Sequence, residues 1–228
     1  MNYKFEKDTL LEVLARPEFN LVYDDDIRTL GGMKIAIDAT LLLGKAADAA
    51  NPQKFLQEGG AALDIQLQDR LVEIIETLRG SHQIELLVVI DGLVPKFVSD
   101  KQNNILQKSK AVWDQLSLVK EGKSTNAQLF YSILETYGPR CFLTELMNAC
   151  LIAKTEFFIA PYFASPQLLH FFRESMVHAI VGSIQCLLFE LPEPNDNELT
   201  QIIVDFDIDQ GSFSFVDSQE LLAKISPK

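Results

Sequence analysis

The chain has 228 residues, of which 47% are hydrophobic and 23% are charged, values typical of a globular protein with a sizeable core. This composition excludes a disordered or low-complexity chain. Asp and Glu number 32 against 20 Lys and Arg, so the formal net charge is −12. Affinity for a phosphate backbone depends on Lys and Arg, so this charge balance argues against a protein built mainly to neutralise phosphates, although a local basic patch remains compatible with it.

The chain also lacks the features of a secreted or membrane protein. Residues 1–6 contain no apolar signal core, and no apolar run reaches the ~20 residues that span a bilayer. The cysteines Cys141, Cys150 and Cys186 lie among apolar neighbours at spacings that fit no zinc or redox motif. They are expected to be buried, reduced thiols. We therefore expect a cytoplasmic protein with no membrane association.

In chain order, hydrophobic periodicity predicts alternating helices and strands. Helices are expected over 6–15, 62–80, 99–120, 126–135, 141–154 and 165–175, with a short helix after 216, and strands over 33–37, 84–90, 157–159, 177–181, 187–189, 202–208 and 213–216. The strand–helix–strand order over 33–90 indicates a βαβ unit with parallel pairing. Together these elements predict one α/β domain over 1–228, with a mainly parallel central sheet flanked by helices.

Two acids follow predicted parallel strands. Asp38 and Asp91 each stand where a strand ends, and in an open α/β sheet this edge holds the ligand crevice. Neighbouring strands lie ~4.8 Å apart, so the two carboxylates could converge on one cation. Asp also caps helices and forms turns well, which is the structural alternative. Position alone leaves both interpretations open.

Other acids are expected to be solvated rather than functional. Residues 24–26, three consecutive Asp, predict a turn. Asp205, Asp207 and Asp209 alternate with apolar residues, which indicates an edge strand with one acidic, exposed face. A calcium loop has a different spacing of acids, glycine and a final Glu, so this segment is not expected to bind calcium.

Four short segments resemble, in the same order, the motifs of flap-endonuclease (XPG-type) nucleases, which have a PIN-like fold. They are residues 35–40 (IAIDAT), 88–92 (VVIDG), 158–161 (FIAP) and 186–189 (CLLF). Each motif alone is weak, but four in order are together fairly specific. The resemblance implies a PIN-like fold in which Asp38 and Asp91 correspond to metal-binding acids.

The same resemblance implies four further acids that this chain lacks. Active enzymes carry Glu-x-Glu after Ala-Pro and Asp-x-Asp before Leu-x-Phe, and these positions hold Phe163, Ser165, Ser183 and Gln185. Two-metal phosphodiester hydrolysis needs cations ~3.5–4 Å apart, held by several carboxylates. Asp38 and Asp91 alone would hold at most one hydrated Mg²⁺ weakly. The resemblance therefore implies a pseudo-nuclease that is not an enzyme and requires no cofactor.

A closer resemblance covers roughly residues 30–216. Residues 160–168 (APYFASPQL), 180–189 (IVGSIQCLLF) and 111–113 (AVW) resemble the maintenance-of-killer-toxin family, whose members look like a degenerate flap nuclease joined to a longer C-terminal region. That family acts in post-transcriptional control with an ataxin-type protein that binds the poly(A)-binding protein. The resemblance implies a protein-interaction scaffold in mRNA regulation or translation control, associated with mRNA indirectly through such a partner.

Tyr162 and Phe163 stand where active enzymes place acids. If exposed, these aromatics are candidate anchors for a partner peptide, because aromatic side chains dominate interface hot spots. The enzyme alternative is a metal-dependent, structure-specific nuclease rebuilt around Asp38, Asp91 and acids outside the motifs.

A third interpretation is a non-catalytic RNA-binding module. Its candidate contacts are four lysines in one stretch of the chain: Lys96, Lys101, Lys108 and Lys110. Lys120, Lys123 and Trp113 lie nearby in the sequence. The helical spacing favours instead a solvated amphipathic helix in which Trp113 faces the core.

Overall fold

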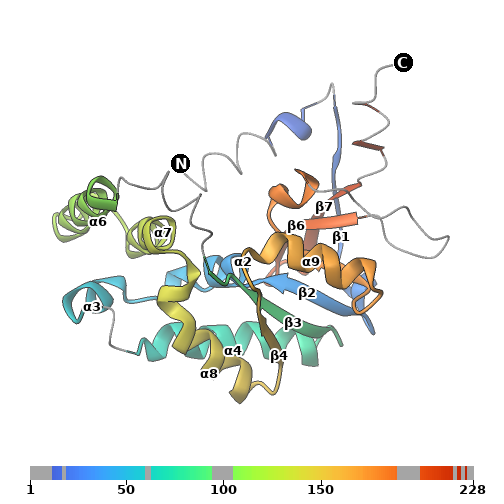
Figure 1. Cartoon of the computed structure of the whole chain (residues 1–228), viewed down its shortest axis with the longest axis horizontal. Helices are drawn as coiled ribbons and strands as arrows, with labels where there is room; N and C mark the ends of the chain where they lie inside the picture. The colour runs from blue at the N-terminus through green and yellow to red at the C-terminus, as the bar shows by residue number, and fades with distance from the viewer. Residues whose placement is uncertain are drawn as a thin grey trace.

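The computed structural model describes residues 12–16, 19–59, 63–93, 105–188, 201–217, 220–221 and 224. One seven-stranded sheet crosses this part of the chain in the order β1-β7-β6-β5-β2-β3-β4 (Figure 1). The strands are β1 Val22–Asp26, β2 Lys34–Asp38, β3 Glu85–Ile90, β4 Glu156–Ile159, β5 Ala179–Val181, β6 Gln201–Asp207 and β7 Ser212–Asp217. β2 to β6 pair in parallel, whereas β7 is antiparallel to both β6 and β1.

Helices cover both faces of the parallel part of the sheet. The α-helices are α2 Ala39–Lys45, α3 Pro52–Gln57, α4 Ile65–Gly80, α6 Ile105–Lys120, α7 Asn126–Tyr137, α8 Leu143–Ile152 and α9 Ala164–Arg173. Short 3₁₀ turns include η1 Ile27–Leu30, η2 Ala47–Ala49, η4 Pro139–Phe142 and η5 Ile184–Leu188. Figure 1 shows α9 above the sheet and α4 and α8 below it. The predicted α/β class, with a mainly parallel sheet flanked by helices, is confirmed.

The central strands are apolar on both sides because each side meets a helical layer. Ile37 of β2 points into the core shared with α2, α4, α7 and α8, while its neighbour Ala36 points into the core under α9. β3 alternates in the same way, with Val88 in the first core and Val89 in the second. Alternation across the pleat therefore splits one continuous apolar run between two cores.

Several predicted elements need correction. Residues 24–26 are not a turn: they belong to β1, because Asp24 and its neighbours pair with β7, far along the chain. β6 is not an edge strand, since it lies between β5 and β7. The strand expected over 187–189 is replaced by the 3₁₀ turn η5, with Phe189 outside the described residues. α2, which begins directly after Asp38, and α3 were not among the predicted helices.

The ends of the remaining elements differ from expectation by a few residues, and parts of four predictions lie outside the described residues, residue 62 of the helix expected over 62–80 among them. Residues 12–14 are helical, but 6–11 are not described, nor are 99–104 before α6. After β7, helical conformation is described at residues 220–221 and 224. Within the described ranges, no helix combines the length and hydropathy needed to cross a membrane.

Candidate functional site

Asp38 is the last residue of β2 and the N-cap of α2. Its Oδ1 accepts a hydrogen bond from the backbone N–H of Thr40 at 2.8 Å, and the residue is 7% exposed. A carboxylate at a helix N-terminus satisfies an otherwise unpaired backbone donor and interacts favourably with the helix dipole. The capping interpretation of Asp38 is therefore confirmed.

Asp91 follows β3 directly and supplies an acceptor to a helix from another part of the chain. Its Oδ1 accepts the backbone N–H of Ala164 at 2.6 Å, at the start of α9. The N-cap residue of α9, Phe163, makes no side-chain cap of its own, so Asp91 takes that role. Burial raises the pKa of Asp91 above its usual value, and the hydrogen bond from Ala164 offsets part of that effect.

The two carboxylates are not level along the sheet. Asp38 pairs in register with Val89, so Asp91 lies two residues further on, about 7 Å along the neighbouring strand. Each carboxylate also accepts a hydrogen bond from a different helix N-terminus. Both aspartates thus reach the predicted sheet edge, where each stabilises a helix start.

A buried thiol, that of Cys186, lies near enough to Asp38 to be affected by its charge. Ser165 is buried, and its hydroxyl hydrogen-bonds the thiol of Cys186, whose pKa burial raises to about 12 with the Asp38 charge adding to the effect. A Cβ at Gly182 would lie 2.7 Å from the Cys186 Sγ, so the thiol packs directly over that glycine. Ser183 Oγ accepts the backbone N–H of Gln185 at 3.3 Å.

The side chains at these positions differ from the metal ligands of a two-magnesium centre. Mg²⁺ prefers charged oxygen ligands, yet the positions beyond Asp38 and Asp91 supply two hydroxyls, one amide and the apolar Phe163. Within the described ranges, no group of three or more His, Cys, Asp or Glu side chains is placed to hold a metal ion. The described residues at these positions do not supply the carboxylates of such a centre.

The cysteines are free, as expected, with one difference in burial. Cys150 and Cys186 are buried, but Cys141 is half-buried. Burial raises the pKa of each of the three thiols to about 12. The thiol form is therefore favoured at neutral pH, which makes these side chains weak nucleophiles and metal ligands.

A close backbone contact joins the loop after β3 to the loop after β4. The N–H of Gly92 donates to the Tyr162 carbonyl at 2.5 Å, and the N–H of Leu93 donates to the Pro161 carbonyl at 3.1 Å. A Cβ at Gly92 would lie 1.7 Å from the Ala160 carbonyl oxygen. Only glycine allows this approach, which explains the Asp-Gly sequence at this point.

Large apolar side chains on the described part of these joined loops reach solvent. Leu93 is 66% exposed, Tyr162 is 55% exposed and Phe163 is 36% exposed. By contrast, Phe171 and Phe172 of α9 are buried in the core above the sheet. The aromatics that were predicted as candidate anchors therefore lie on the surface beside Asp91.

The candidate RNA contacts are only partly described. Lys96 and Lys101 lie outside the described residues, whereas Lys108 is half-buried and Lys110 is exposed on α6. The expectation that Trp113 faces the core is wrong, because this side chain is 52% exposed. Val112 and Leu116 fill the core side of α6, and a step of ~100° per residue turns Trp113 outward.

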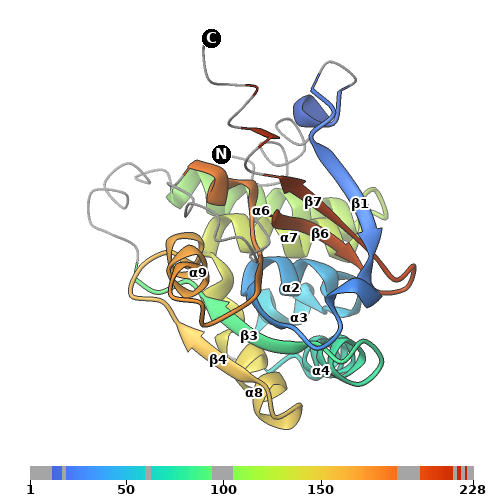
Figure 2. The same cartoon turned by 90° about the vertical axis from the view of Figure 1, so that its right-hand side faces the viewer.

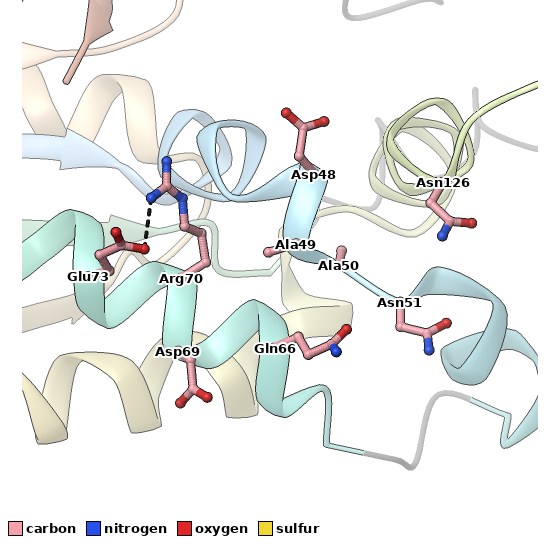
Figure 3. Close-up of a pocket in the computed structure, with 9 residues that line it drawn as sticks. All are labelled: Asp48, Ala49, Ala50, Asn51, Gln66, Asp69, Arg70, Glu73 and Asn126. Carbon is pink, nitrogen blue, oxygen red and sulfur yellow. Dashed lines mark hydrogen bonds and ion pairs between the residues drawn. The ribbon is translucent and has the colours of Figure 1, made fainter. Parts of the chain in front are cut away.

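A polar cavity of about 570 Å³, which the sequence did not predict, opens between η2, α4 and α7 (Figure 3). Arg70 lies in it and pairs with Glu73 at 2.7 Å. Of the predicted site residues that the structure describes, none lines this cavity; its described walls are Asp48, Ala49, Ala50, Asn51, Gln66, Asp69, Arg70, Glu73 and Asn126. The acids in its wall outnumber the one arginine, so it is unsuited to a phosphate group.

Asp91→Asn is expected to be at least as stable as the parent chain at pH 7, because Asn retains an oxygen for the Ala164 N–H without a charge to desolvate. The pKa of Asp91 is raised above the unfolded value of about 3.9, so its ionisation penalises the folded state at pH above both values. The advantage of Asp91→Asn should therefore disappear as pH falls to about 4. Asp91→Ala loses the acceptor and should cost about 1–2 kcal/mol.

Urea unfolding at pH 7 and pH 4 measures both effects, with Asp209→Asn as a control at an exposed acid. Equal destabilisation by Asp91→Asn and Asp91→Ala at pH 7 would contradict the prediction, because the charge itself would then be the stabilising feature.

No protein-family model matches the chain, and no curated protein matches it. Solved structures do share its fold. The catalytic core of Rad2 in complex with a DNA substrate is 16% identical, with a TM-score of 0.54, over 89% of this chain and 53% of that one. Human GEN1 in complex with Holliday junction DNA is 15% identical, with a TM-score of 0.58, over 95% of this chain and 45% of that one.

The chain has the XPG-type, PIN-like nuclease fold. At these identities the similarity establishes the fold alone, as the motifs around Asp38 and Asp91 had predicted. The chain spans about half the length of the two structures that it matches.

Proposed function

We propose that this chain is a catalytically inactive XPG-like domain that serves as a protein-interaction scaffold in post-transcriptional mRNA regulation or translation control. One observation carries the loss of catalysis. At the sheet edge, Asp38 and Asp91 cap two helices, and Ser165 hydrogen-bonds the Cys186 thiol where the XPG-type motifs have an acid. With so few charged oxygens, a pair of cations would face little compensation for its mutual repulsion.

The regulatory role rests on the resemblance of residues 160–168 and 180–189 to the maintenance-of-killer-toxin family. In this proposal the protein is cytoplasmic and binds a protein partner, of which an ataxin-type protein is the leading candidate. It reaches mRNA through that partner. It requires no cofactor, and any Mg²⁺ at Asp38 and Asp91 is weakly held and dispensable.

The exposure of Trp113 favours a second candidate function, the direct binding of single-stranded RNA. Trp113 and Lys110 both lie on the solvent side of α6, and an exposed indole beside a lysine suits base stacking with phosphate contact. Lys120 and Lys123 follow near the end of the same helix, where Lys123 pairs with Glu121 at 2.8 Å.

Cleavage of labelled single-stranded and flap RNA and DNA, in Mg²⁺ or Mn²⁺, tests the proposal. The parent chain is expected to cleave no faster than Asp38→Ala, with Asp209→Ala as a control at an exposed acid. Robust cleavage that disappears in Asp38→Ala would establish the nuclease alternative. A salt-sensitive mobility shift without cleavage would support the RNA-binding candidate.

A further inference from the structure

The loops after β3 and β4 form one small apolar surface with a cation at its side. We call it the mouth surface and define it by Leu93, Arg140, Tyr162 and Phe163. Leu93 and Tyr162 lie on loops that are joined by two backbone hydrogen bonds, and Phe163 follows Tyr162 directly. Arg140 is exposed, and its Nη1 donates to the Gly92 carbonyl at 3.4 Å, which places its side chain beside Leu93.

The mouth surface is preorganised. The Gly92–Tyr162 and Leu93–Pro161 hydrogen bonds hold the loops together, and the close approach of Gly92 to Ala160 leaves them little room to shift. The Asp91 carboxylate then fixes the chain at the start of α9, one residue after Phe163. Binding to loops that are already ordered avoids much of the conformational entropy that flexible loops lose.

The acids of β1 and β6 lie away from this surface, whereas the half-buried Asp91 carboxylate accepts a hydrogen bond from the N–H next to Phe163. Asp24, Asp25, Asp205 and Asp207 lie on β1 and β6, and Figure 2 shows β1 and β4 at opposite sides of the sheet. In the strand order, β6 is separated from β4 by β5, β2 and β3, which corresponds to roughly 19 Å. This distance exceeds the Debye length of about 8 Å at physiological ionic strength, so those acids are screened at the mouth surface.

We propose that the mouth surface binds a short acidic segment of a partner protein, with apolar side chains against Leu93, Tyr162 and Phe163 and a carboxylate against Arg140. An arginine guanidinium matches a carboxylate through paired N–H donors, and aromatics and arginine are the residue types that dominate interface energetics. The inference rests on the proposed scaffold role, for which it names the class of partner. It does not depend on the loss of catalysis.

A protein segment fits these residues better than a nucleic acid does. Binding along a phosphate backbone relies on several lysines or arginines, whereas Arg140 is the single cation among the four residues that define the mouth surface. The three apolar side chains instead supply the desolvated centre of a peptide-binding surface, with the cation at its rim.

Panning a phage library of random peptides on the immobilised chain tests the inference, with soluble Arg140→Glu protein as competitor. The expected result is enrichment of peptides that carry two or more apolar side chains and a net negative charge. A panel of the enriched peptides, made synthetically with a fluorescent label, is then titrated with each variant. Tyr162→Ser should weaken binding about 30-fold, and Arg140→Glu at least about 10-fold.

Matched controls lie at exposed sites elsewhere. Leu151→Ser, at a leucine that is 64% exposed on α8, and Arg173→Glu, at the end of α9, should each leave affinity within about twofold. Enrichment of basic or uncharged peptides, no enrichment at all, or equal effects from the control variants would overturn the inference. A chain that cleaves nucleic acid yet selects acidic peptides would refute the catalytic part of the proposed function and leave this inference intact.

Discussion

Gly92→Ala is expected to destabilise the chain by about 3–5 kcal/mol. The new methyl group would lie 1.7 Å from the Ala160 carbonyl oxygen, and no side chain in that contact can rotate away because the obstructing atoms are backbone. The loops after β3 and β4 must therefore separate, which breaks the Gly92–Tyr162 and Leu93–Pro161 hydrogen bonds. Urea unfolding followed by circular dichroism measures the loss of stability. The expected outcome is a cooperative transition at a much lower urea concentration than in the parent chain.

Gly80→Ala is the matched control for that prediction. Gly80 is the last residue of α4, and a Cβ there meets nothing within 4 Å. Alanine at a helical position of this kind is expected to raise stability by up to about 1 kcal/mol. A Gly92→Ala chain that unfolds within about 1 kcal/mol of the parent would show that the two loops are not held together in solution.

Restoring the four missing acids is expected to make folding stability depend on Mg²⁺. New carboxylates beside Asp38 repel one another and lower stability in the absence of metal, because Ser165 is buried and a charge there is poorly solvated. A bound cation reverses this, and free Mg²⁺ at 100 times its dissociation constant would stabilise the fold by about 2.7 kcal/mol. The substitutions are Phe163→Glu, Ser165→Glu, Ser183→Asp and Gln185→Asp.

The measurement is unfolding across a MgCl₂ series, compared with KCl at equal ionic strength. The parent chain is expected to respond equally to both salts. An uncharged control variant tests whether size rather than charge is responsible; it carries Phe163→Gln, Ser165→Gln, Ser183→Asn and Gln185→Asn. Selective stabilisation of the parent by Mg²⁺, equal to that of the restored variant, would show that Asp38 and Asp91 already hold the metal tightly.

The parallel half of the fold could be predicted because its strands have a strong local signal. β2 and β3 are continuous apolar runs, and α4 between them carries a regular apolar stripe that includes Leu71 and Ile74. β1 could not be predicted in the same way, since Val22–Asp26 contains three acids and forms a strand only through its pairing with β7. The local signal therefore decided the centre of the sheet but not its acidic edge.

The candidate site was predictable in position and not in its contacts. Asp38 and Asp91 were placed at the carboxyl ends of strands by the hydrophobic pattern. The partner of Asp38 is two residues away, so capping was a reasonable alternative from the sequence. The partner of Asp91 is Ala164, 73 residues away, and Arg140 reaches Gly92 across 48 residues; nothing local indicates either contact. Trp113 was misplaced because its spacing from Val112 and Leu116 does not determine which side of α6 a neighbouring helix covers.

The pairing of β1 with β7 also sets the order in which the sheet can be completed. The Ser214 hydroxyl donates to the Asp24 carboxylate at 2.6 Å across 190 residues of chain. A ribosome that adds about 5–20 residues per second needs roughly 10–40 s to synthesise that length, during which β1 has no β7 to pair with. Closing such long loops also slows folding. Three consecutive aspartates on a strand in this position discourage pairing with other nascent chains, so the acidity of β1 protects the protein before it is folded.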